Sequence, residues 1–301
     1  MDQPINAFTI DVEDYFHVTA LSRTIARSSW ESIPPRVEQS TRRVLDVLDE
    51  FGVKGTFFVL GWVAERFPAL VREIDRRGHE VACHGYSHQL VYEQTPEEFR
   101  EETIRAKGIL EEIIGRPVAG YRAASYSITP RSYWAIEILC EAGFSYDSSI
   151  FPIVHDRYGD RSAPRFPYTI EGEKARMLEF PLSTWQLPGL RLPVSGGGYF
   201  RLLPYWLIRK GLDSINRRER MPFIFYLHPW ELDPEQPRVA TSAFSAFRHY
   251  SNLDKTEARL RRLLQDFRFT TVQETLDAMS AATLGRDALV GAVHATSQGR
   301  G

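Results

Sequence analysis

Two histidines in the segment VACHGYSHQ, residues 81–89, have a spacing that suits metal binding. His84 and His88 lie four residues apart, directly after the short run of residues 80–83. Two imidazoles in this spacing converge on one cation either on adjacent helical turns or where a strand ends and the chain curls. Because H-x-x-x-H also occurs often by chance, the pair predicts a metal site only if other ligands lie beside it.

Carboxylates crowd into the segment DVED, residues 11–14, after a short apolar strand predicted at residues 5–10. Most acidic clusters of this kind are solvated loops, but crowded carboxylates repel one another unless a cation or a proton relieves them. Asp11, Glu13 and Asp14 are therefore further candidate ligands or bases. Two imidazoles and one carboxylate form a site with open positions, which is typical of catalytic rather than structural metals.

The elements that must position these residues alternate between strands and helices. Apolar residues recur at helical spacing in residues 37–51, 61–77, 95–114, 130–142, 205–216, 253–267 and 273–280. Strands are predicted at residues 5–10, 54–60, 79–83, 118–122, 144–147, 223–227 and 269–272. This alternation predicts an α/β fold, an irregular (β/α) barrel of about seven strands. We expect one domain over residues 1–282, with a long insertion at 150–204 that contains one candidate strand at 177–180, and a flexible tail at 283–301.

In such barrels the reacting groups lie at the C-terminal ends of the strands, and the polar candidates sort to those ends. These candidates are Asp11, Glu13, Asp14, His84, His88, Arg122, Asp147 and His228. A divalent ion there polarises a carbonyl and acidifies its bound water, and a carboxylate accepts the proton. His228 is placed to protonate a leaving group, Asp147 to hold its ring, and Arg122 to orient the base. The set predicts amide or ester hydrolysis.

Five segments carry a family resemblance: FTIDVED, HGYSH, GYRAASYS, YDSSIFP and FIFYLHPWE. Over residues 5–150 and 220–275 the sequence resembles the NodB-homology polysaccharide deacetylases, carbohydrate esterases that remove acetyl groups from glycans. The resemblance implies that Asp11 is the base, that His84 and His88 bind a metal, usually zinc, and that Arg122 orients the base. It also implies that His228 is the acid and that Asp147 is its partner.

Three more residues receive roles beside the reacting groups. The resemblance implies that the backbone N–H of Ser125 stabilises the oxyanion and that Leu227 lines the pocket for the acetyl methyl group. Trp230 lies two residues beyond His228 and is a candidate for stacking on a sugar ring, although core packing is the commoner use of a tryptophan.

The acidic segment departs from the family pattern, which has two adjacent aspartates. Here Val12 follows Asp11, so the third metal ligand is Glu13 if the motif has the form D-x-[DE] and Asp14 if the alignment carries a gap. We favour Glu13. The histidine motif departs as well, because Gly85 stands where the family often has Ser or Thr.

The predicted function is a metal-dependent deacetylase that acts on N-acetyl, or O-acetyl, groups of a bacterial exopolysaccharide or its lipid-linked precursor. The segments EFPLSTW and LPVSGGGYFRLLP resemble the subgroup encoded with exosortase (PEP-CTERM) exopolysaccharide loci. Two alternatives stay open. One is a hydrolase of small cyclic amides or imides, allantoinase-like, on the same fold; the other is a catalytically silent glycan-binding protein.

Charge and hydropathy limit which partners and which location we expect for the protein. The 301 residues carry a net charge of −2, which gives no electrostatic reason to expect nucleic acid. No window approaches eighteen uninterrupted apolar residues, and the N-terminus lacks a signal-peptide pattern, so we expect no membrane span and a cytoplasmic location. The expected partner is an acetylated glycan substrate. The sequence leaves the oligomeric state, including a homo-oligomer, open.

Overall fold

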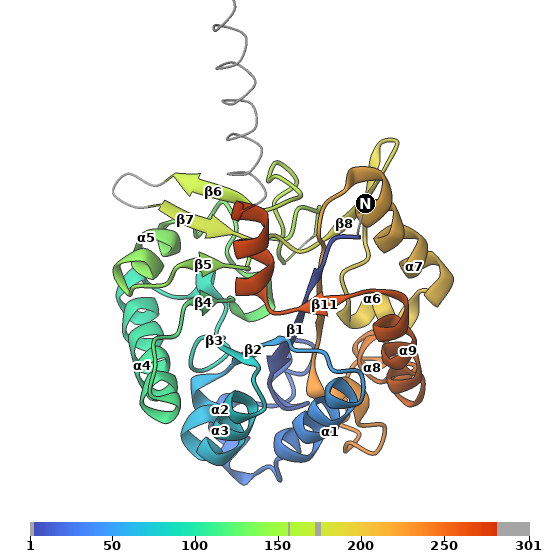
Figure 1. The fold of residues 1–301 in the computed structure, drawn as a ribbon. Coiled ribbons are helices and arrows are strands. Elements are labelled where there is room, and N and C mark those ends of the chain that lie inside the picture. The colour runs from blue at the N-terminus through green and yellow to red at the C-terminus, as the bar shows by residue number, and fades with distance from the viewer. Residues whose placement is uncertain (1–2, 156, 172–175, 282–301) are drawn as a thin grey trace, which may run out of the picture.

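One curved sheet organises the protein in the computed structural model, which describes residues 3–155, 157–171 and 176–281 (Figure 1). Its strand order is β10-β1-β2-β3-β4-β5-β7-β6, and β11 pairs with the start of β1. All pairings are parallel except β6 with β7. The strands are β1 (Asn6–Val12), β2 (Thr56–Val59), β3 (Glu80–Cys83), β4 (Gly120–Tyr121), β5 (Tyr146–Asp147), β6 (Tyr168–Glu171), β7 (Arg176–Glu179), β10 (Ile224–Leu227) and β11 (Phe269–Thr270).

Helices α1 to α5 lie around the outside of this sheet, which confirms the predicted α/β class as an open, curled half-barrel (Figure 1). No helix in the described part of the chain is long and apolar enough to cross a bilayer. The helices are α1 (Val37–Glu50), α2 (Gly61–Arg66), α3 (Pro68–Arg76), α4 (Pro96–Ile114), α5 (Trp134–Glu141), α6 (Gly197–Leu202), α7 (Tyr205–Ser214), α8 (Ala243–Tyr250) and α9 (Leu253–Asp266), and a further helix covers residues 272–281.

Several boundaries differ from the sequence prediction for identifiable reasons. The single helix predicted at residues 61–77 is two helices, because Pro68 has no N–H to continue α2 and instead begins α3. Residues 150–204, with one predicted strand, contain β6, β7, α6 and the hairpin of β8 (Thr184–Leu187) with β9 (Leu190–Pro193). Within this segment β7 continues the parallel sheet beside β5. The predicted tail at 283–301 lies outside the described residues.

Side chains on the sheet alternate between two faces, and this alternation decides which residues reach the interior. Phe8, Ile10 and Val12 of β1 belong to the large core between the sheet and the helices. Asp11 lies between Ile10 and Val12, so it points to the opposite, concave side, where it contacts Arg122. The strand therefore buries a carboxylate inside the barrel while its neighbours pack into the core on the helix side.

A glycine segment lies directly against the backbone of β10. Gly196 pairs with Tyr226 of β10, and the N–H of Tyr226 donates to the Ser195 carbonyl at 2.7 Å. Gly196 has φ of 130°, and an added Cβ atom would lie 1.9 Å from the Tyr226 carbonyl oxygen. Only glycine permits this close approach of two backbones.

This packing predicts a large difference in the free energy of unfolding between variants of two neighbouring glycines. Gly196→Ala should lower the free energy of unfolding by on the order of 3 kcal/mol, because the Cβ atom meets the β10 backbone. Gly198→Ala should be neutral or slightly stabilising, because an added Cβ atom there meets nothing within 4 Å. Urea unfolding followed by circular dichroism measures both. Equal stabilities for the two variants would contradict the described pairing.

Candidate active site

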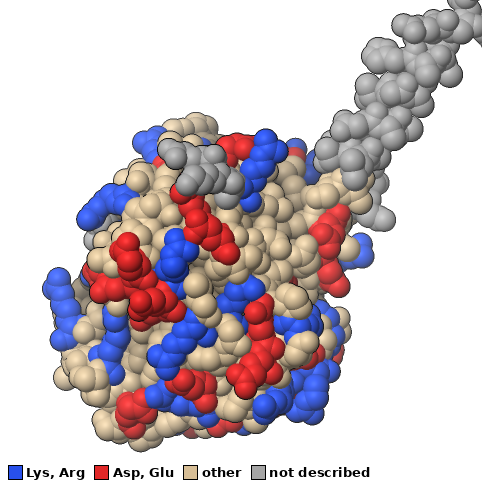
Figure 2. Space-filling view, turned by 90° about the vertical axis from the view of Figure 1, so that its left-hand side faces the viewer, with Lys and Arg blue, Asp and Glu red and all other residues tan. Residues whose placement is uncertain are grey.

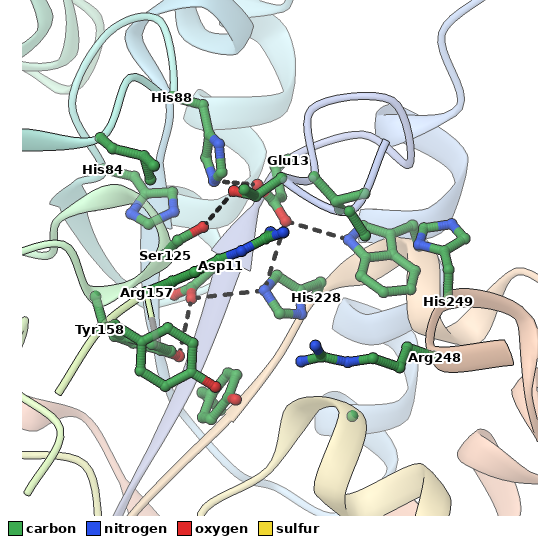
Figure 3. Close-up of a pocket in the computed structure, with 18 of the residues that line it drawn as sticks. Asp11, Glu13, His84, His88, Ser125, Arg157, Tyr158, His228, Arg248 and His249 are labelled. Carbon is green, nitrogen blue, oxygen red and sulfur yellow. Dashed lines mark hydrogen bonds and ion pairs between the residues drawn. The ribbon is translucent and has the colours of Figure 1, made fainter. Parts of the chain in front are cut away.

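Three potential metal ligands meet at the C-terminal end of the sheet (Figure 3). Glu13, His84 and His88 each offer one ligand atom within 4.8 Å of the others, and all three are buried. Glu13 Oε2 lies 2.8 Å from His88 Nε2, yet it accepts no hydrogen bond from a described residue. Two imidazole nitrogens and a carboxylate oxygen are donors that a divalent cation such as zinc prefers, so these residues fit a metal.

The ring of His84 is fixed in the orientation that a ligand needs. Its Nδ1 lies 2.8 Å from the Arg122 carbonyl oxygen. Because a carbonyl only accepts, Nδ1 carries the proton and Nε2 keeps its lone pair for a cation. Burial lowers the pKa of His84 to about 4, so the ring is neutral and available for coordination at neutral pH.

Glu13, His84 and His88 line a cavity, and residues with left-handed backbone conformation are concentrated around it. Five non-glycine residues of the described chain have positive φ, and His88, Ser125 and Tyr126 among them line the cavity. Such conformations cost free energy and cluster at functional sites. Gly85 also has a φ of 72°, which explains the glycine in HGYSH, since this position favours a residue without Cβ.

Asp14, the alternative third ligand, lies outside the metal cluster. Its Oδ2 accepts hydrogen bonds from the backbone N–H groups of Arg36 (2.6 Å) and Val37 (2.8 Å), and its Oδ1 accepts from Tyr15 N–H (2.8 Å). It thus caps the start of α1, where Arg36 supplies no side-chain cap. The structure brings Glu13, and not Asp14, to His84 and His88.

Asp11, which also lines the cavity, is held in place by a buried arginine. Arg122 is fully buried and its Nη1 donates to Asp11 Oδ1 at 2.7 Å and to Thr9 Oγ1 at 2.8 Å. Its Nε and Nη2 donate to the carbonyl and hydroxyl oxygens of Ser148. Asp11 Oδ2 remains directed into the cavity, 3.9 Å from His228 Nε2. A carboxylate oriented in this way can accept a proton.

His228 also lines the cavity, and it is held by a residue that was not predicted from the sequence. Its Nδ1 lies 2.9 Å from Glu231 Oε2, and Arg201 Nε donates to the other Glu231 oxygen at 2.6 Å. Burial alone would lower the pKa of His228, but Glu13 and Glu231 outweigh it and raise the pKa to about 9. A cation bound at Glu13 would offset the Glu13 part of this effect, whereas Glu231 would remain. The available signal was the glutamate three residues after His228 in HPWE.

Asp147 is not the partner of His228, which corrects the sequence prediction. It lies at the end of β5 in register with Glu179 of β7, and the two buried carboxyl groups interact: Asp147 Oδ2 and Glu179 Oε2 accept no hydrogen bond from another described residue. Ser149 Oγ donates to the other Asp147 oxygen. Two buried carboxyls in contact share a proton, because both cannot ionise cheaply. Asp147 therefore supports the sheet and does not reach the acid.

Leu227 differs from its predicted placement, whereas Trp230 lies at the cavity and packs against other rings. Leu227 is fully buried in the core on the helix side of β10 and does not line the cavity. The preceding Tyr226 points inward and lines it, as strand alternation requires. Trp230 lines the cavity but stacks on the rings of His228 and His249, and its Nε1 donates to Glu13 Oε1 at 3.3 Å. It supports the acid and the ligand, and only 6% of it is exposed.

Ser125 lies in the cavity wall, in the short turn that follows β4 (Figure 3). Its Oγ lies 2.6 Å from Thr19 Oγ1, which anchors the short turn in its left-handed conformation. The role of its N–H as an oxyanion donor stays a prediction.

Comparisons with known proteins agree with this fold. Residues 25–145 match the polysaccharide deacetylase family, and residues 148–277 match a domain of unknown function, DUF3473. The match to the polysaccharide deacetylase family therefore covers the N-terminal part of the chain, and the match to DUF3473 covers the C-terminal part. A Mycobacterium smegmatis protein assigned to the polysaccharide deacetylases has a similar structure, with a TM-score of 0.63, 21% identity and coverage of 93% of this chain and 91% of that one. The allantoinase Puue is similar with a TM-score of 0.58, 18% identity and coverage of 90% and 88%.

Curated relatives match over shorter segments. A peptidoglycan-N-acetylglucosamine deacetylase of Bacillus cereus is 39% identical over 25% of this chain and 27% of its own length. A peptidoglycan deacetylase of Helicobacter pylori is 26% identical over 49% and 54%, and a chitooligosaccharide deacetylase of Bradyrhizobium is 31% identical over 33% and 43%. The chain thus spans about half or less of the length of these relatives.

The carboxyl pair beside the site predicts a pH-dependent stability. Burial raises the pKa of Asp147 to about 6, and burial with the nearby Asp147 charge raises that of Glu179 well above its ordinary value. Since the folded state then binds protons more tightly than the unfolded chain, the pair's contribution to stability is greatest below about pH 4 and falls as the pH rises through about 6.

Glu179→Gln removes one titrating group while its amide still donates to Asp147. We expect it to raise the free energy of unfolding at pH 8 by on the order of 2 kcal/mol and to flatten the pH dependence. Urea unfolding at pH 5.5 and pH 8 tests this, with the exposed Glu171→Gln as a control. An unchanged pH dependence in Glu179→Gln would rule out the shared proton.

Proposed function

We propose that the protein is a metal-dependent deacetylase that hydrolyses N-acetyl groups of a bacterial exopolysaccharide or its precursor. The observation that carries this proposal is the position of Glu13 between the two sides of the cavity. Its Oε2 lies 2.8 Å from His88 Nε2 on the metal side, and its Oε1 lies 3.5 Å from His228 Nε2 on the acid side. A base, a set of metal ligands and an acid thus surround one small space.

Glu13, His84 and His88 would hold the cation, and zinc suits this donor set best. When bound, a divalent cation supplies Lewis acidity to the acetyl carbonyl and to the attacking water. The N–H of Ser125 is the backbone donor proposed to stabilise the negative charge that develops on the carbonyl oxygen.

Proton transfer is the work of the chain's own residues. Asp11, oriented by Arg122, accepts the proton from the attacking water. His228, held through Nδ1 by Glu231, directs Nε2 into the cavity and protonates the departing amine. Arg201 fixes Glu231, much as an outer carboxylate and its partners fix a histidine in other hydrolases.

The region matched by DUF3473 supplies the acid half of this arrangement. His228, Glu231 and Arg201 all lie within residues 148–277, whereas His84, His88 and Arg122 lie within residues 25–145. The relatives' names give peptidoglycan N-acetylglucosamine and chitooligosaccharides as substrates, which supports an acetylated amino sugar. The assignments of an exopolysaccharide substrate and of the exosortase-associated subgroup rest on the resemblance found in residues 150–204.

The metal assignment predicts a contrast between two neighbouring carboxylates. Glu13→Gln should weaken zinc affinity by at least about 100-fold and abolish acetate release, because it removes a ligand. Asp14→Asn should change zinc affinity little, because the asparagine carbonyl can still accept from the start of α1. Isothermal titration with zinc and an acetate-release assay on N-acetylglucosamine oligomers measure both. Loss of zinc in Asp14→Asn with retention in Glu13→Gln would reverse the assignment.

The assignment of His228 as the acid, with Glu231 as its partner, predicts that substitutions of Glu231 and Asp147 lower kcat to different extents. Glu231→Gln should lower kcat by about 100-fold or more, because His228 loses the charge that keeps it oriented and protonated. Asp147→Asn should lower kcat by less than about tenfold, since it does not contact His228. Circular dichroism shows whether both variants fold. A larger loss in Asp147→Asn would restore it as the acid's partner, and hydrolysis of allantoin without acetate release would contradict deacetylation altogether.

A further inference from the structure

Two arginine side chains line the cavity without serving the proposed catalytic groups. Arg157 lies in the segment after β5 and Arg248 lies on α8, and both are exposed to solvent at the cavity. Figure 3 shows the Arg157 side chain extended across the site and the Arg248 side chain directed toward His228. Two segments far apart in the sequence thus bring positive charge to one opening.

The carboxylates of the site already have cationic or imidazole partners. Asp11 is paired with Arg122 at 2.7 Å, and Glu231 is paired with Arg201 at 2.6 Å. Glu13 faces the metal histidines. Within the described residues, no carboxylate lies within ion-pair distance of the Arg157 or Arg248 guanidinium. Their charges are therefore not needed to balance the catalytic acids.

Arginines on other surfaces of the protein are used differently. On the face around α4, acidic and basic side chains are interspersed (Figure 2). There Arg105 pairs with Glu65 at 2.9 Å, and Arg100 pairs with Glu141 at 2.5 Å. The cavity opening differs from this paired surface, because two guanidinium groups face a space that a substrate must enter.

The chemistry of these groups indicates what the substrate carries. A guanidinium group presents a fork of N–H donors that matches carboxylate and phosphate oxygens, and an acetamide alone gives it no charge to bind. We propose that the substrate bears an oxyanion, either carboxylate or phosphate, close to its acetylated sugar, and that Arg157 and Arg248 bind it. This inference rests on the proposed deacetylation and specifies the class of glycan.

The aromatic lining of the same cavity agrees with a sugar beside that anion. Tyr92, Tyr158 and Tyr226 line it together with the two arginines. Aromatic side chains present apolar surface with a polar edge, which suits sugar rings. Arg157 and Arg248 both belong to the region matched by DUF3473, so that region would contribute substrate selection as well as the acid.

The test compares acetate release from three substrates. These are a neutral N-acetylglucosamine tetramer, an oligosaccharide that alternates N-acetylglucosamine with glucuronic acid, and N-acetylglucosamine 1-phosphate. For the wild type, kcat/KM on one of the two anionic substrates should exceed that on the neutral one by about tenfold or more. In Arg157→Gln and Arg248→Gln this ratio should fall by about tenfold, mainly through KM. Arg72→Gln on α3 removes the same charge far from the cavity and should leave the ratio unchanged.

The outcomes separate the inference from the proposed function. Preference for the glucuronic acid oligosaccharide assigns a carboxylate, and preference for the sugar phosphate assigns a phosphate. Equal kcat/KM on all three substrates, or a ratio unchanged in both cavity variants, would overturn the anionic class while leaving deacetylation in place. No acetate from any substrate would overturn the deacetylase proposal itself.

Discussion

Arg122 is fully buried, and its contacts join the parts of the site that must act together. Its guanidinium donates to Asp11 and Thr9 of β1 and to Ser148 after β5, while its carbonyl oxygen accepts from His84. A buried charge is costly unless paired and hydrogen-bonded, and here every arm of the guanidinium has an acceptor. One residue thereby orients the proposed base through its side chain and fixes the proposed ligand through its backbone. The geometry of the cavity follows from this cross-link.

The fold was predictable to the extent that local pattern determines it. The capping box at Thr95 and Glu98 marks the start of α4, and alternation of strands and helices gives the parallel sheet. In residues 150–204 the strand at 177–180 was predicted, but its position beside β5 was not, because that pairing joins segments about thirty residues apart. α8 was missed because its two phenylalanines, Phe244 and Phe247, face solvent and break the apolar periodicity.

The site was predictable for residues fixed by spacing and strand ends, as with His84, His88 and Glu13. It was not predictable where a partner is chosen by packing. Asp147 and Glu231 are both carboxylates near the ends of strands. Only the register of β5 with β7, which pairs Asp147 with Glu179, shows that Asp147 is not the partner of His228. For Trp230 both sugar stacking and core packing were open, and its indole stacks on the rings of His228 and of His249 on α8. Such choices depend on contacts between segments that sequence spacing does not encode.

The central claim is that two halves of the chain, matched by different families, enclose one metal-centred cavity with an acid opposite. Anomalous diffraction at the zinc edge from crystals of the zinc-loaded protein tests this most directly. We expect a single strong peak within coordination distance of Glu13 Oε2, His84 Nε2 and His88 Nε2, on the cavity side that faces His228. A peak at another group of residues, or zinc-loaded crystals with no peak among these three atoms, would contradict it.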